Sequence, residues 1–443
     1  MQGDDRHTER TGQAEQTIAC HECDAIHRVP AQLQRREVAH CACCHAELHH
    51  HQAANALERC LSLYLSAFIL FIIANLFPFI TLKLSAQENV SVLLSGPAAL
   101  FAAGNVDIAA LVLLCSIVFP LLTMLGALYL LIPAFFGIHA PATGAVFRLI
   151  HRLMPWSMLG IFMLGVIIAV VKLLDMAEID FGIALAAFVV LLPIMVFAQQ
   201  YFDSSLFWPP QRRVSGVEMQ LRGRASHYRL LHCHTCSYLL RQRDHGEIQH
   251  CPRCGDHLHF RKPNSLARTK SLLVTGIMLF IPANLFPVMS VVYFGQDDPS
   301  TILGGVAHLV TAGMWPLGLI VFFASIMVPV SKFVAIIFLL HSVRRGSRWR
   351  PEDRTRLYRV IEVIGSWSMV DVFVIGLLTS LVQFGGLTTI HPEIGASFFA
   401  ATVVVTMLAT HSFDPRLMWD AMEERKKTGS SNPPISSRRY SHV

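Results

Sequence analysis

Residues 73–80 read IANLFPFI and residues 281–289 read IPANLFPVM, so one pentapeptide, ANLFP, occurs twice in the chain. An asparagine and a proline are both costly inside an apolar helix, because proline removes a backbone donor and clashes with the preceding turn. A costly motif that is repeated indicates a repeated structural unit. Asn75 and Asn284 lie 209 positions apart, and Pro120 and Pro329 have the same separation.

Two later motifs extend the repeat. MPWSMLG around Trp156 matches GSWSMVD around Trp367, and FDSSLFW from Phe202 matches FDPRLMW from Phe413, each with an offset of 211. The sequence therefore predicts two tandem copies of one unit. We interpret ANLFP as a shared device that kinks or ends a helix, with a direct role in substrate binding as the alternative.

The composition indicates a polytopic membrane protein. Of the 443 residues, 53% are hydrophobic and 15% are charged, and the mean hydropathy is +0.47. A helical span needs roughly 20 mostly apolar residues. Eight stretches meet this requirement: Leu61–Leu82, Val106–Ile132, Trp156–Leu174, Phe181–Tyr201, Ser271–Tyr293, Trp315–Leu340, Ile364–Phe384 and Gly395–His411.

The distribution of basic residues predicts the orientation of these spans. Residues 341–359 hold seven arginines, and residues 211–270 and the tail after Pro415 are also basic, so all three are expected in the cytoplasm. The acidic connections 173–180, 290–300 and 384–394 are expected outside. Both termini are then cytoplasmic, and four spans in each copy make the repeat parallel rather than inverted. We attribute the net charge of +6 to this topology rather than to nucleic-acid binding.

Each copy is preceded by two CxxC motifs with the spacing of a zinc ribbon. The predicted ligands of the two structural Zn²⁺ ions are Cys20, Cys23, Cys41 and Cys44 in the first ribbon and Cys233, Cys236, Cys251 and Cys254 in the second. Thiol redox chemistry and regulatory metal sensing are the alternatives. Cys43 competes with Cys44 as the fourth ligand, and the run His49, His50 and His51 is a place for adventitious metal.

Charged residues inside the predicted spans are candidate functional groups, because they are costly there. Lys332 and Asp371 are each expected about 10–12 Å from the cytoplasmic surface, where they would form an ion pair. Lys172 and Asp175 lie three positions apart near the outer end of the third span. Each pair is interpreted either as a structural pair that fixes helix register or as a proton-linked transport element.

The order of these features resembles the paraquat-inducible protein A family, with its PqiA and LetA branches. The motifs ANLFP, ASIMVPVSK at 324–332, WSMVDVFVIGLL at 367–378 and FDPRLMWD at 413–420 carry the resemblance, which covers residues 18–422. It implies tetraspanin-like four-helix modules in the inner membrane of a Gram-negative bacterium. It also implies a periplasmic or membrane-anchored MCE-domain partner that forms a tunnel, phospholipid transport between inner and outer membranes, and a role in outer-membrane integrity. The polar network of the family falls on Lys172, Asp175, Ser325, Lys332, Ser368, Asp371 and Thr406.

The predicted architecture is mainly α-helical and has six parts. These are a disordered leader (1–17), zinc ribbon 1 (18–50), a transmembrane module (57–208), zinc ribbon 2 (226–260), a second module (268–420) and a disordered cytoplasmic tail (421–443). A phosphate-binding GxxxxGK[ST] loop is absent from the sequence, and we expect no enzyme activity. A membrane thiol–disulfide oxidoreductase and a zinc-dependent stress-response scaffold are the alternatives. Lipid identity, transport direction, energy source and oligomeric state stay open.

Overall fold

The computed structural model describes residues 15–30, 37–50, 55–84, 87–138, 140–173, 178–209, 223–242, 250–293, 296–311, 313–347, 349–381, 383–384 and 388–428. Within these ranges eight helical segments are long and apolar enough to cross a membrane. They are Ala56–Leu76, Val106–Phe135, Thr143–Val171, Ile183–Tyr201, Ser265–Leu285, Gly318–Arg344, Pro351–Ser380 and Ile394–Ser412. The prediction of eight spans in two copies is confirmed.

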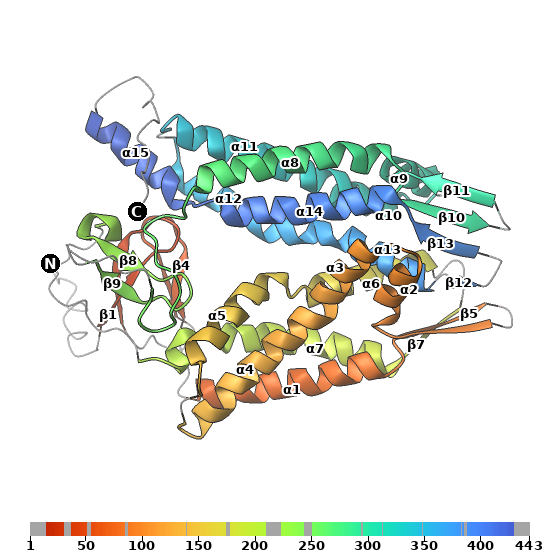
Figure 1. Cartoon of the computed structure of the whole chain (residues 1–443), viewed down its shortest axis with the longest axis horizontal. Coiled ribbons are helices and arrows are strands. Elements are labelled where there is room, and N and C mark those ends of the chain that lie inside the picture. The colour runs from red at the N-terminus through yellow and green to blue at the C-terminus, as the bar shows by residue number, and fades with distance from the viewer. Residues whose placement is uncertain are drawn as a thin grey trace, which may run out of the picture.

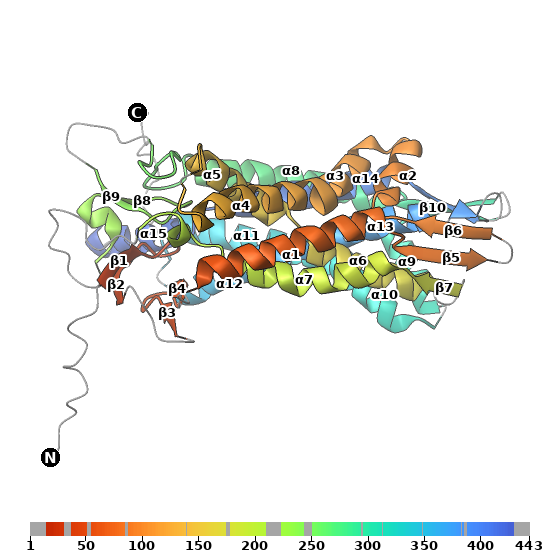
Figure 2. The same ribbon diagram turned by 90° about the horizontal axis from the view of Figure 1, so that it is seen from below.

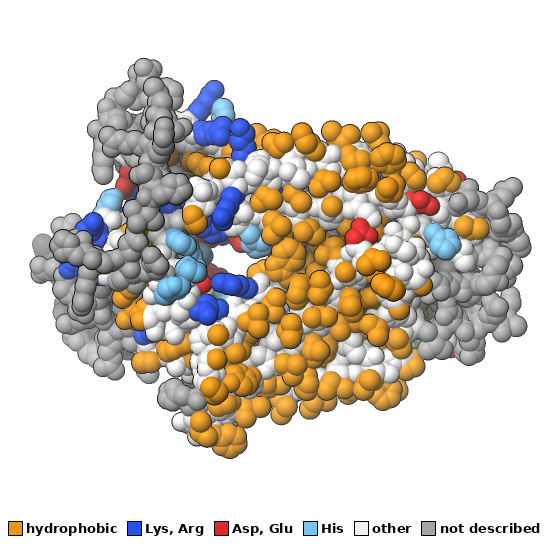
Figure 3. Space-filling view, in the orientation of Figure 1, with side chains coloured by type: hydrophobic (Ala, Val, Ile, Leu, Met, Phe, Trp, Pro, Cys, Tyr) orange, Lys and Arg blue, Asp and Glu red, His pale blue; other side chains and the backbone are white. Residues whose placement is uncertain are grey.

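The molecule has three layers along its long axis, with small ribbon sheets at one end, a helical bundle in the middle and two further sheets at the other end (Figures 1 and 2). The ribbon strands are β1 (Glu15–Ala19), β2 (Ile26–Pro30), β3 (Val38–His40), β4 (Glu47–His50), β8 (Leu230–His232) and β9 (Leu239–Arg241). Apolar side chains cover the bundle surface between the two ends (Figure 3). Such an apolar band is what a lipid-facing surface requires.

Module 1 contains α1 (Ala56–Leu76), α2 (Ser95–Ala102), α3 (Val106–Leu113), α4 (Phe119–Phe135), α5 (Thr143–Leu153), α6 (Leu159–Leu173) and α7 (Ile183–Tyr201). Module 2 repeats this order with α8 (Ser265–Leu285), α9 (Ile302–Thr311), α10 (Trp315–Phe322), α11 (Val328–Arg344), α12 (Pro351–Gly365), α13 (Val370–Leu381) and α14 (Ile394–Ser412). A final helix, α15 (Arg416–Thr428), follows. It continues past residue 420, so part of the segment expected to be a disordered tail is helical.

ANLFP ends the first helix of each module. The last helical residues are Leu76 and Leu285, because the prolines two positions later cannot continue the helix. The asparagine side chain turns back onto its own helix, where Asn75 Nδ2 donates to the Phe71 carbonyl and Asn284 Nδ2 to the Phe280 carbonyl, each at 2.8 Å. The predicted spans Leu61–Leu82 and Ser271–Tyr293 were therefore wrong at their ends, since the chain turns into strands after the proline.

Those strands form one antiparallel sheet for each module. In module 1, β5 (Ile80–Leu84) lies between β6 (Gln87–Ser91) and β7 (Glu178–Phe181). In module 2, β10 (Met289–Tyr293) lies between β11 (Gln296–Ser300) and β13 (Thr388–Pro392), with β12 (Gln383–Phe384) at the edge. The acidic connections of the sequence thus form the sheets at the end opposite the ribbons.

The third span of each module is a broken helix. In module 2, α12 joins α13 through the 3₁₀ turn Ser366–Met369, and in module 1 the 3₁₀ turn Met154–Trp156 lies between α5 and α6. Residues 351–359, which the sequence placed in a cytoplasmic loop, belong to α12. The prediction from apolar length found only the C-terminal part of each third span, because the N-terminal part is amphipathic.

A two-fold relation connects the modules. The second span of each contains a π-helical turn, Leu114–Val118 or Phe323–Met327, and these turns are 209 positions apart. Between the modules, Phe162 of α6 packs edge-on against Phe373 of α13 with ring centroids 5.5 Å apart. The two residues are 211 positions apart, so they occupy the same position of the repeat. Equivalent residues of the two modules therefore contact each other. This is the contact expected at a two-fold axis.

Gly182 precedes the fourth span of module 1 and packs against the turn that follows ANLFP, where there is no space for a side chain. A Cβ atom at Gly182 would lie 2.0 Å from the Pro78 carbonyl oxygen. We therefore expect Gly182→Ala to destabilise the module by about 1–3 kcal/mol, as overpacking does elsewhere. Thermal unfolding of the detergent-solubilised chain measures this change.

Gly160→Ala is the matched control, because a Cβ atom at Gly160 would meet nothing within 4 Å. Its melting temperature should equal or exceed that of the wild type, since alanine favours a helix. Equal melting temperatures for Gly182→Ala and the wild type would contradict the steric requirement for glycine at this position.

Candidate functional site

The eight predicted zinc ligands lie on four knuckles of the same design. In each, the backbone N–H of the first cysteine donates to the carbonyl five residues later, as from Cys20 to Ala25 at 2.9 Å and from Cys233 to Tyr238 at 2.9 Å. The residue after each second cysteine has a positive φ. These residues are Asp24, His45, Ser237 and Gly255, with φ between 57° and 73°. The turn directs both thiols of a knuckle to one side.

The thiols form two buried clusters that fit a metal ion. Within each cluster the four Sγ atoms lie within 4.8 Å of one another. The close pairs are 3.4 Å apart in ribbon 1 and 3.5 Å apart in ribbon 2. Tetrahedral zinc with bonds of about 2.3 Å requires separations of roughly 3.8 Å, whereas a disulfide requires about 2.05 Å. The clusters therefore suit a closed metal centre such as zinc.

Cys44, rather than Cys43, completes the first cluster. Cys44 is buried with the other three ligands, whereas Cys43 is half-buried and lies outside the group. The backbone N–H of Cys43 instead donates to Cys41 Sγ at 3.4 Å.

The ribbons are crossed with respect to the modules: each ribbon packs on the module that it does not directly precede in the sequence. Ribbon 1 precedes module 1 but packs on module 2, where Arg359 of α12 donates to Glu22 at 2.7 Å and to the Cys44 carbonyl at 2.6 Å. Ribbon 2 packs on module 1, where Arg148 of α5 donates to the Cys254 carbonyl at 2.5 Å. Arg148 and Arg359 are 211 positions apart, so equivalent arginines bind the carbonyl of the fourth cysteine of the opposite ribbon.

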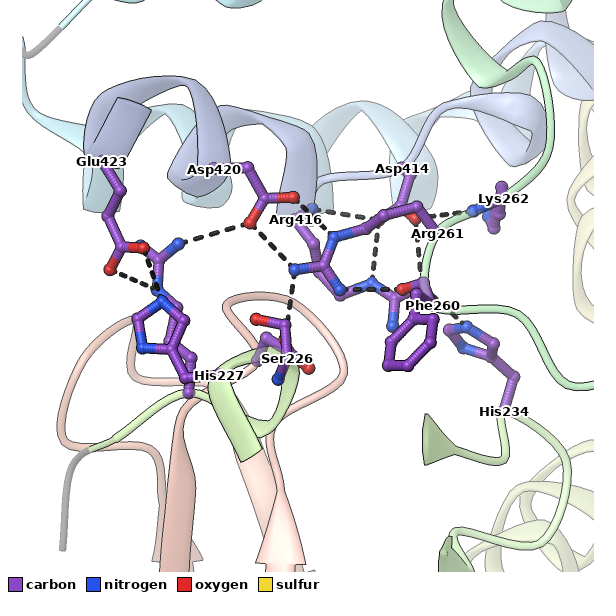
Figure 4. A network of polar contacts seen from close by, with 12 residues as sticks. Ser226, His227, His234, Phe260, Arg261, Lys262, Asp414, Arg416, Asp420 and Glu423 are labelled. Atoms are coloured by element: carbon purple, nitrogen blue, oxygen red, sulfur yellow. Dashed lines mark hydrogen bonds and ion pairs between the residues drawn. The ribbon is translucent and has the colours of Figure 1, made fainter. Parts of the chain in front are cut away.

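A network of charged residues joins both ribbons to α15 (Figure 4). Arg261, in the segment before α8, donates to Asp420 at 2.6 and 2.8 Å and to Asp24 of ribbon 1 at 3.1 Å. Asp414 accepts hydrogen bonds from the Arg416 guanidinium at 3.0 Å and from the Lys262 backbone N–H at 3.0 Å. Arg416 and these hydrogen bonds outweigh burial and hold the pKa of Asp414 at about 2.

His234 of ribbon 2 accepts a hydrogen bond from this network. The Arg416 guanidinium lies 3.0 Å from His234 Nε2. A guanidinium can only donate, so the imidazole accepts this hydrogen bond through the lone pair of a neutral ring nitrogen. Ribbon 2 is thereby attached both to module 1 and to the end of module 2.

A cavity of ≈ 630 Å³, counting its open mouth, lies at the opposite end of the bundle from the ribbons. Its walls are mostly apolar and come from module 2 and from Ile168 of α6. Ser325 and Asp371 line it, and the Ser325 hydroxyl donates to Asp371 Oδ2. Gly305, Leu309 and Phe399 also line it.

The cavity lies where the two-fold relation fails. In module 1, α2 packs closely on α13, so that a Cβ atom at Gly96 would lie 3.5 Å from the Gly376 carbonyl oxygen. The equivalent glycine 209 positions later is Gly305 of α9, and a Cβ atom there would meet nothing within 4 Å. Helix α9 thus leaves open the space that α2 fills.

Lys332 and Asp371 do not form the predicted ion pair: no ion pair among the described residues joins them. Lys332 Nζ donates to the Gly365 carbonyl at 2.5 Å and to Ser368 Oγ at 2.9 Å. The broken helix explains this difference, because the 3₁₀ turn after Gly365 exposes a carbonyl that the ammonium satisfies. Among the described residues, Lys332 contacts Ser368 and Asp371 contacts Ser325.

The remaining predicted network residues have different surroundings. Thr406 of α14 is buried and donates to the Val403 carbonyl of its own helix at 2.9 Å. The side chain of Lys172 and the whole of Asp175 lie outside the described residues. Module 1 has Thr123 and Gly160 at the positions of Lys332 and Asp371, and Thr123 donates to the Pro120 carbonyl at 2.8 Å. The two modules share a shape and differ in polar groups.

The sequence analysis missed the residues that attach the ribbons. FDPRLMWD marked the repeat and the family resemblance, but no structural contact was predicted for its Asp414, Arg416 and Asp420, which are the centre of the charged network. A signal is present when the two copies are aligned, because Arg148 and Arg359 occupy the same position in two segments that share few other residues. A charge retained at one position in both copies indicates a repeated contact.

Comparison with known proteins gives consistent similarities. The family model described as paraquat-inducible protein A matches residues 57–211 and 266–423. The intermembrane transport protein PqiA of Escherichia coli K12 is 32% identical over 418 residues, which cover 92% of this chain and 96% of that protein. A probable intermembrane transport protein of Haemophilus influenzae is 28% identical, with 92% and 97% covered. The lipophilic envelope-spanning tunnel protein A of Escherichia coli K12 is 28% identical, with 91% of each chain covered. No solved structure matches.

Replacement of one thiol tests the metal clusters. We expect Cys251→Ser to remove one of two bound zinc ions and to destabilise ribbon 2, because the metal supplies the folding free energy of a small ribbon. Zinc measured by inductively coupled plasma mass spectrometry gives the stoichiometry. Cys43→Ser is the matched control and should keep both ions; loss of zinc in this control would make Cys43 the fourth ligand.

The low pKa of Asp414 predicts a pH-dependent contribution to stability. A depressed carboxyl pKa stabilises the fold above the unfolded-state value of 3.8, and this contribution is lost as the pH falls towards about 2. We expect Asp414→Asn to destabilise the chain by about 2 kcal/mol at neutral pH and by less at acidic pH. Urea unfolding over a pH series measures the difference.

Asp353→Asn is the control for this series, because Asp353 forms only exposed pairs with Arg350 and Arg356. Exposed pairs contribute little, so its unfolding curves should follow those of the wild type. A pH-independent loss in Asp414→Asn would show that packing, rather than charge, is responsible.

Proposed function

Because the chain belongs to the paraquat-inducible protein A family, we propose that it is the inner-membrane subunit of a system that transports phospholipid between the inner and outer membranes of a Gram-negative bacterium. The relatives named for intermembrane transport and for an envelope-spanning tunnel support this proposal. In it, the ribbons and both termini lie in the cytoplasm, and the sheets face the periplasm. An MCE-domain protein that forms a tunnel is the proposed partner, and no covalent reaction is catalysed.

The cavity beside Gly305 is the observation that carries the proposal. Its wall is apolar, as acyl chains require, while Asp371 and Ser325 supply hydrogen-bonding groups of the kind that a lipid headgroup uses. It lies near the sheets, at the end where a periplasmic partner would receive lipid. Because Gly96, the counterpart of Gly305, is packed against Gly376, the lipid site is proposed for module 2 alone.

Asp371 and Lys332 are proposed to couple lipid movement to protonation. Asp371 is at the cavity wall, and Lys332 is 1% exposed and bound to the break in the third span. An ionisable residue inside a membrane is costly and therefore marks a functional position. A change in the charge of Asp371 would alter both its contact with Ser325 and the polarity of the cavity.

The four-thiol geometry supports structural ribbons over the oxidoreductase alternative. Dithiol exchange needs one accessible CxxC pair, but all eight ribbon thiols are buried in closed groups of four. In the proposed function the ribbons hold the cytoplasmic end of the two modules together.

A substitution that fills the cavity tests the function. We expect Gly305→Leu to fold normally, since its side chain would enter open space, and to lose co-purified phospholipid in native mass spectrometry. Expressed in a strain that lacks the native gene, it should fail to restore resistance of the outer membrane to detergent. Gly304→Leu, on the exposed face of the same helix, should behave as wild type.

In the same assays, Asp371→Asn distinguishes lipid binding from the coupling of lipid movement to protonation. It should keep lipid, because the cavity volume is unchanged, and should lose outer-membrane protection. If Gly305→Leu keeps both lipid and protection, the cavity is not the lipid site. Protection by Asp371→Asn equal to that of the wild type would remove the coupling role.

A further inference from the structure

Three histidines lie together on the surface of ribbon 2. His250 and His257 face each other across an antiparallel bridge, with ring centroids 4.3 Å apart. His259 is two residues further along, and its ring is stacked parallel to that of His257 at 6.3 Å. All three are exposed. Histidines are prominent at the ribbon end of the molecule, where they gather beside Lys and Arg (Figure 3).

His250 is oriented in the way that a metal ligand is oriented. Its Nδ1 lies 3.3 Å from the Gly255 carbonyl oxygen, to which it donates. This hydrogen bond places the proton on Nδ1 and leaves the lone pair of Nε2 available. Metal-binding histidines commonly donate their second ring nitrogen to a carbonyl in this manner, which fixes both the tautomer and the ring.

The equivalent face of ribbon 1 has different chemistry. His40, 210 positions before His250, pairs across its hairpin with Glu47, which occupies the position of His257. The backbone positions are therefore shared by the two ribbons, while the directly opposed pair of imidazoles belongs to ribbon 2. His40 and His49 of ribbon 1 stand at the positions of His250 and His259, so the two ribbons differ at the central position, where Glu47 replaces His257.

We propose that His250, His257 and His259 form a second, exposed site on ribbon 2 for a divalent transition-metal ion such as Zn²⁺ or Ni²⁺. Imidazole nitrogen suits these ions, and two imidazoles on opposed strands can bind one ion at about 2.0–2.1 Å. The third imidazole joins by rotation of its side chain. Unlike the closed thiol clusters, this site is open to solvent and therefore exchanges its ion.

Metal titration of the full chain tests this site. The protein is purified in detergent without a polyhistidine tag, its ribbons are saturated with zinc, and free metal is removed. NiCl₂ is then titrated by calorimetry, and bound nickel and zinc are counted by mass spectrometry. We expect the wild type to bind one more ion than the triple variant His250→Gln, His257→Gln, His259→Gln. Both ribbon zinc ions should remain in each protein.

His40→Gln is the matched control, because it removes a histidine from the same position of the other ribbon. It should bind as many nickel ions as the wild type and melt at the same temperature. Equal nickel binding by the wild type and the triple variant would overturn the proposal. Loss of nickel in the His40→Gln control would likewise overturn it and would move the site to ribbon 1.

Discussion

The packing of Phe162 against Phe373 is the contact on which the arrangement of the two modules depends. Four spans in each copy make both copies enter the membrane in the same direction, so their symmetry axis must run along the membrane normal. On such an axis a residue meets its own counterpart. The third spans, α6 and α13, therefore form the centre of the molecule, and a close approach by Gly165, whose Cβ atom would lie 3.2 Å from Phe373 Cβ, permits it.

The cavity and the ionisable residues of module 2 lie where the two modules differ. Gly96 is packed against α13, whereas its counterpart Gly305 faces open space. The same side of module 2 carries Asp371 and Lys332 in place of Gly160 and Thr123. The equivalent contacts of the two copies form the frame of the molecule, and differences at a few positions of the second copy leave a cavity that is lined by Asp371.

Periodicity and spacing predicted most of the fold. The number of spans, the tandem repeat and the eight thiols followed from local signals, because apolar length and CxxC spacing reflect short-range constraints. The ends of the spans could not be predicted in this way, since Phe79, Ile80 and Leu82 continue the apolar run beyond Pro78. The ion pair of Lys332 with Asp371 was predicted from depth alone, and depth does not show that a 3₁₀ turn offers the nearer carbonyl of Gly365. Crossing of the ribbons depends on contacts between distant segments, such as Arg359 with Cys44, which local patterns do not contain.

The crossed ribbons give the metal an influence on the relation between the modules. A small ribbon derives its folding free energy from its metal, and each ribbon here presents the carbonyl of a ligand cysteine to an arginine of the opposite module. Arg148 and Arg359 can make these bonds only while the knuckle that holds the carbonyl is folded. Ribbon 1 is attached through its sequence to module 1 and through Arg359 to module 2, and ribbon 2 has the converse attachments. The modules are therefore held together by the ribbons at one end and by the Phe162–Phe373 contact in the middle.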